Sequence, residues 1–114
     1  MNSDIKIVKA NELKESQDII NHINTSGMVS FLQYCSEDIR NNKEIYRVAT
    51  KTYSGSIAYA SDKLRNDKEF VLELIELAPE AIVGVGYSLK DDLEVILKSL
   101  IFAKDKSVMS WKIQ

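Results

Sequence analysis

The sequence feature that most constrains the fold is a short motif that recurs about every 25 residues. The segment "YCSEDIRNNKEIY" at residues 34–46 is followed by "YASDKLRNDKEFV" at residues 59–71, and "KDDLEV" at residues 90–95 is a third, shorter version. We call the step from Tyr34 to Tyr59 the repeat period. Repetition at a fixed spacing is typical of stacked architectures, because each unit buries its apolar face only against its neighbours. We therefore expect successive copies of one structural unit.

Each copy joins a helix-start signal to an apolar pattern with helical spacing. Asn41, Asn66 and Asp91 each precede a glutamate by three residues, a spacing similar to that of a capping box. Apolar residues three and four positions apart then predict one buried helix face. The residues of this face are Ile45, Val48 and Ala49, then Val71, Leu74, Ile75 and Ala78, then Ile96, Leu100 and Ile101. Small residues before each capping signal predict a short helix that packs closely against the long helix.

These signals predict an all-α fold, a short solenoid of stacked helix pairs with a period of about 25 residues. One α-helical repeat domain is expected over residues 1–114, since this length suits a single domain and 45% of the residues are hydrophobic. The expected units are a degenerate first copy at about 7–31, clearer copies at about 32–56, 57–81 and 82–106, and a C-terminal cap at 107–114.

Charge and composition narrow the range of partners and compartments. A net charge of −2 provides no basic field for a phosphate backbone, so direct binding of nucleic acid is disfavoured. The single cysteine, Cys35, cannot form an internal disulfide. The chain shows no signal-peptide pattern and no apolar run of the length that a membrane-spanning helix needs. We expect a soluble, cytoplasmic protein without a membrane partner.

The segment "YASDKLRNDKEFV", preceded by "IA", resembles the repeat of a bacterial helical family known only as a domain of unknown function. Units of that family carry Tyr-Ala-Ser, then Leu-Arg, then Asp-Lys-Glu and Val over paired helices. The preceding copy has Cys35 in place of Ala and Asn42 in place of Asp. The third copy departs further, with Gly84 at the Tyr position and Leu93 at the Lys position. The resemblance implies an all-helical repeat fold and carries over no catalytic residue.

Few side chains offer chemistry, and we predict no enzyme activity, catalytic residue, metal site or cofactor. His22 is the only histidine and has just Asp18 at helical spacing, whereas a zinc site needs at least three protein ligands. Cys35 takes the position of Ala60 in the next copy, so a small buried side chain is expected. The segment "GVGYS" at residues 84–88 lacks the third glycine and the lysine of a phosphate loop, and close helix packing explains its glycines better.

Five residues are candidates for binding a partner. Arg40, Arg65 and Lys90 take equivalent positions and would form a basic column that could bind an acidic surface or phosphates, although the glutamates that follow could offset their charge. Tyr53 lies at a predicted helix end and Trp111 in the predicted C-terminal cap. Both are aromatic, and aromatic residues often anchor interfaces.

We therefore predict a macromolecule-binding protein that acts by surface complementarity, with another protein as its partner. Two alternatives stay open: a small mobile-element-type inhibitor that blocks a nucleic-acid-processing enzyme, and a self-associating structural module that forms a homo-oligomer. The first rests on the small size, the absent catalytic groups and the negative net charge. The second rests on Leu100, Ile101 and Phe102, because the ends of solenoids expose apolar faces unless polar residues cover them.

Overall fold

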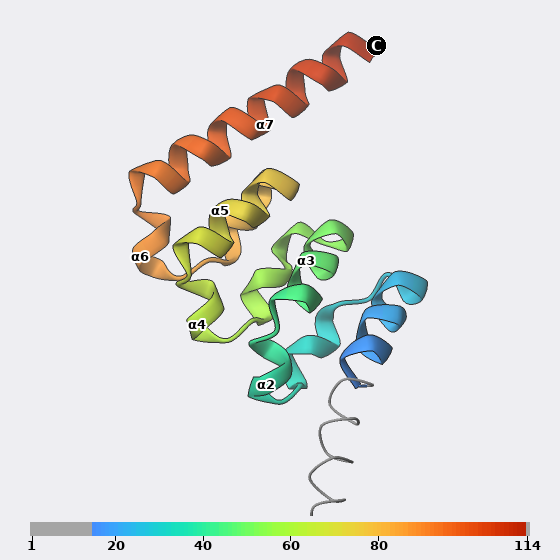
Figure 1. Ribbon diagram of the computed structural model, residues 1–114. Coiled ribbons are helices and arrows are strands. Elements are labelled where there is room, and N and C mark those ends of the chain that lie inside the picture. Colours follow the sequence, from blue (N-terminus) through green and yellow to red (C-terminus); the bar gives the residue numbers. More distant parts are fainter. Residues whose placement is uncertain (1–14, 114) are drawn as a thin grey trace, which may run out of the picture.

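The computed structural model describes the backbone of residues 15–113 and the side chains of residues 15–104. The described backbone contains helices and connecting turns and no β-strand, which confirms the all-α class (Figure 1). A helix at residues 15–26 comes first. The elements that follow, with η for a 3-10 helix, are η1 (Ser30–Tyr34), α2 (Glu37–Arg40), α3 (Lys43–Thr52), η2 (Ser54–Tyr59), α4 (Asp62–Arg65), α5 (Lys68–Leu77), η3 (Pro79–Gly84), α6 (Tyr87–Lys90) and α7 (Leu93–Ile113).

The elements after the first helix form three sets in the same order, namely a 3-10 helix, a short α-helix and a long α-helix. The short α-helices begin at Glu37, Asp62 and Tyr87, so each starts one repeat period after the one before. Each short segment before a long helix is thus two helices and not the single one expected. In the second set the break falls at Ala60 and Ser61, whose backbone is extended.

Side-chain caps begin both kinds of α-helix. The Ser61 hydroxyl accepts a hydrogen bond from the Leu64 N–H at 3.3 Å, which starts α4. The side chains of Asn42, Asp67 and Asp92 likewise accept from the N–H groups three residues later, which starts the long helices. The expected caps Asn41, Asn66 and Asp91 were wrong by one residue, since they end the short helices instead.

The core follows the same repeat period. The short helices bury Ile39, Leu64 and Leu89, and the long helices bury Ile45, Phe70 and Val95. The predicted inner faces of α3 and α5 are confirmed at residues such as Ala49, Leu74 and Ile75. On α7 the prediction was wrong, because Leu100 and Ile101 are 61% and 57% exposed and the buried side carries Val95 and Ser99.

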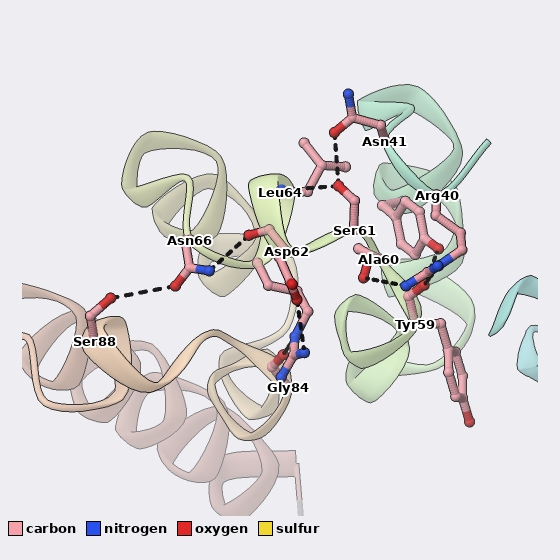
Figure 2. A network of polar contacts seen from close by, with 12 residues as sticks. Arg40, Asn41, Tyr59, Ala60, Ser61, Asp62, Leu64, Asn66, Gly84 and Ser88 are labelled. Carbon is pink, nitrogen blue, oxygen red and sulfur yellow. Dashed lines mark hydrogen bonds and ion pairs between the residues drawn. The ribbon is translucent and has the colours of Figure 1, made fainter. Parts of the chain in front are cut away.

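Arg40 joins the first set of elements to the second. Its Nε donates a hydrogen bond to the Tyr59 carbonyl at 3.1 Å, and its own carbonyl accepts from the Ser61 N–H at 2.8 Å (Figure 2). The buried Tyr46 hydroxyl donates to the same Tyr59 carbonyl at 2.9 Å. The end of α2 is therefore held against the end of η2 by hydrogen bonds in both directions.

Arg65 makes the equivalent junction between the second set and the third. Its Nε donates to the Gly84 carbonyl at 3.0 Å, and its carbonyl accepts from the Gly86 N–H at 2.8 Å. A Cβ at Gly84 would lie 2.7 Å from the Ile57 Cγ2, so the glycine is what lets η3 approach η2. This contact agrees with the close packing expected from the "GVGYS" segment.

Candidate functional site

The three cations of the predicted basic column have different partners within the fold. Arg40 and Arg65 donate to the carbonyl groups of Tyr59 and Gly84, as described above. The Lys90 ammonium lies over the Tyr87 ring, 5.3 Å from its centroid. Two of the three side chains thus contribute to the junctions between sets, and their role in binding a partner stays a prediction.

The two aromatic candidates lie in different parts of the chain. Tyr53 follows α3 and is 52% exposed, with its ring close to the backbone of Gly55. Trp111 belongs to the last part of α7, and its side chain lies outside the described residues. The binding roles of both residues remain predictions.

Chemically reactive side chains are scattered over the described part of the chain. His22 packs edge-on against the Phe31 ring, with 5.2 Å between ring centroids. Burial, followed by the nearby Glu15 carboxylate, raises the pKa of the Cys35 thiol and so disfavours its nucleophilic thiolate form. Between residues 15 and 104, no three His, Cys, Asp or Glu side chains are grouped so that they could hold a metal ion. No helix that the structure describes has the length and apolar character needed to cross a bilayer.

One side of α3 meets α5. The Lys43 ammonium pairs with the Asp67 carboxylate at 3.2 Å, and the Arg47 guanidinium donates to the Glu73 carboxylate at 3.3 Å. Thr50 lies on the same side of α3 as Lys43 and Arg47, because positions four and three residues apart share a helix face. It is only 1% exposed. The side of α3 that carries Lys43, Arg47 and Thr50 meets the next long helix, and we call it the forward face of α3.

The forward face of α5 lies one repeat period further along the chain and meets α7. The Lys68 ammonium pairs with the Asp92 carboxylate at 3.0 Å, and the Glu76 carboxylate pairs with the Lys98 ammonium at 2.6 Å. Ile75 lies between these two pairs along the helix and is 0% exposed. The long helices thus follow one another across the molecule, with α7 at its edge (Figure 1).

The forward face of α7 has no described element packed on it. One further repeat period defines this face as Leu93, Leu97, Leu100 and Ile101, which are 69%, 48%, 61% and 57% exposed. All four side chains are apolar, and their spacing places them along one side of the same helix. This is why Leu100 and Ile101 depart from the predicted burial: the equivalent residues of α5 have a following helix beside them.

Sequence reasoning did not select Leu93 and Leu97 as site residues, although the repeat contains a signal for them. The position of Leu93 carries Lys43 and Lys68 in the earlier copies, and both lysines form ion pairs with the following unit. Leu97 takes the position of Arg47, which also pairs forward, and of Leu72, which is apolar. The third copy is the first in which both positions are apolar, so neither can form the forward ion pairs of the earlier copies.

These features define an all-helical protein, and one family comparison identifies it further. The profile of the family described as Domain of unknown function (DUF4116) matches residues 19–65 and, in an overlapping match, residues 49–83. Together the matches span more than half of the chain, so the chain belongs to this family. Comparison with curated proteins and with solved structures gives no significant match. The forward face of α7 lies beyond the matched residues.

Proposed function

We propose that the protein is a short helical solenoid that binds another macromolecule through its surface and carries out no chemical reaction. The repeat unit would be the set of 3-10 helix, short helix and long helix, recurring once per repeat period. The forward face of α7 would be the binding surface. Consistent with the resemblance of the repeat, we place this activity in the cytoplasm of a bacterium.

The proposal is carried by the contrast between two residues at equivalent positions. Ile75 is 0% exposed against the following helix, whereas Leu100 is 61% exposed. Full burial of a Leu or Ile side chain is worth about 1.5–3 kcal/mol, so a partner that covered four such side chains would gain substantially. Single exposed apolar residues are ordinary on a protein surface, but a contiguous set on one helix face marks an interaction site.

The geometry of the equivalent faces supports a protein partner that presents a helix. On α3 and α5 this face receives the next long helix, and an amphipathic helix is a standard partner for an apolar helix face. The α3 face pairs with carboxylates through Lys43 and Arg47. The α7 face has no cation among its four residues, so it would select an apolar stripe and not an acidic one.

Photo-crosslinking from the face itself tests this function. A benzophenone amino acid would be placed at Leu97, and in a matched control at Val83, an apolar residue of η3 that is 67% exposed. In cells that express the chain, we expect a crosslinked polypeptide from position 97 and much less from position 83. Equal yields from both positions, or none from position 97, would contradict the proposed function.

A further inference from the structure

We infer that the partner of the α7 forward face is a second copy of this chain, bound face to face about a two-fold axis. This inference rests on the proposed function, since it names the occupant of the same surface. The observations behind it are the charge distribution on the three forward faces, the polar exposed residues of the first described helix, and the length of α7.

The three forward faces differ in the charged residues that they carry. In a two-fold contact the same patch is present on both sides, so a charged residue near the axis meets its own copy. The α3 face, with Lys43 and Arg47, would place like charges opposite each other. The four residues of the α7 face are uncharged, and the next charge along its stripe is Lys104. The α5 face carries Lys68 and Glu76, so the α7 face is the one of the three whose contact with itself buries no charged residue.

The first helix that the structure describes does not complement this face. Exposed residues of the helix at residues 15–26 include Gln17, Asp18, Asn21 and Asn24, all of them polar. A head-to-tail contact would bury the leucines of α7 against these groups and remove the groups from water, which is unfavourable without new hydrogen bonds. A face-to-face contact buries apolar side chains against apolar side chains.

The spacing and length of α7 suit a pair of helices. Leu93, Leu97 and Leu100 are separated by four and then three residues, which gives the narrow apolar seam of two packed helices. With 21 residues α7 is about 30 Å long, whereas α3 and α5 have 10 residues each. It runs past the end of α5 (Figure 1). A second α7 packed along it could therefore also contact the part of α7 that lies beyond α5.

Sedimentation equilibrium on the full chain tests this inference with a charge exchange at the centre of the face. The wild-type chain should approach a mass of twice 12.9 kDa as its concentration rises. Leu97→Glu and Leu97→Lys should each weaken dimerisation by roughly 100-fold, because each buries two like charges near the axis. An equimolar mixture of the two variants should regain the dimer, since each Glu then meets a Lys.

The matched control is Val83→Glu, which adds the same charge at an exposed apolar residue of η3 and should dimerise like the wild type. Circular dichroism verifies that every variant is folded. A wild-type chain that stays monomeric overturns the inference, as does a mixture that fails to dimerise. If position 97 nevertheless crosslinks to a different polypeptide, the proposed function survives. If position 97 gives no crosslink, both fall.

Discussion

The second and third sets of elements have the same order but different surroundings. In the second set, Ile75 of α5 is buried against α7, and Arg65 donates to the carbonyl of Gly84. In the third set, Leu100 is largely exposed at the position of Ile75, and Lys90 packs over its own neighbour Tyr87 at the position of Arg65. The same position of the repeat can thus be buried or exposed, depending on whether a following element packs beside it.

The largest expected difference is between Ile75→Ala and Leu100→Ala. The first change leaves a cavity beside α7 and should lower the free energy of unfolding by about 2–5 kcal/mol. The second removes an exposed side chain and should change it by less than about 0.5 kcal/mol in the monomer. Urea denaturation at low protein concentration measures both values. Equal losses would show that the two positions have the same surroundings.

A smaller difference is expected between Arg65→Ala and Lys90→Ala. Loss of the Arg65 guanidinium leaves the Gly84 carbonyl without this donor and should cost about 1–2 kcal/mol of stability. Lys90→Ala removes only a surface contact with an aromatic ring, and a change within about 0.5 kcal/mol is expected. The midpoints of chemical denaturation give both values, and a larger loss at Lys90 than at Arg65 would contradict the difference between the two sets.

The contribution of the junction between α5 and α7 to the stability of the fold should also depend on pH. The Lys68 ammonium, together with the Val95 N–H, lowers the pKa of the Asp92 carboxyl. Because the folded-state pKa lies below the unfolded value, this contribution to stability is complete above the unfolded pKa and is lost as pH falls through the folded one. We expect Asp92→Asn to flatten the stability profile between about pH 5 and pH 2. An unchanged slope would mean that this ion pair does not contribute.

The smallest effect is expected for Leu93→Lys, which restores the residue type of Lys43 and Lys68 at the exposed start of α7. The side chain is 69% exposed, so the free energy of unfolding of the monomer should change by less than about 0.5 kcal/mol. Thermal denaturation of the dilute protein measures this. A clear loss of stability would show that Leu93 packs within its own chain.

The sequence predicted the long helices and the inner faces of α3 and α5, because these depend on local patterns. Ile75 illustrates this, since the apolar spacing marks the buried side of α5, whereas the start of that helix was predicted one residue early, at Asn66 and not at Asp67. The break at Ser61 was not predicted, because small residues suit both a continuous helix and two short ones. The exposure of Leu100 could not be read from its own segment, since it depends on what packs beside α7.

The most direct measurement is the solvent accessibility of the Leu100 methyl groups, followed by NMR with a soluble paramagnetic probe. If the α7 forward face binds a second copy, these signals should be attenuated by the probe at low protein concentration and protected at high concentration. Protection in Leu97→Glu should require a roughly 100-fold higher protein concentration than in the wild type. The exposed Val83 methyl groups serve as the internal reference. Leu100 signals that stay as strongly attenuated as those of Val83 at all concentrations would contradict the account.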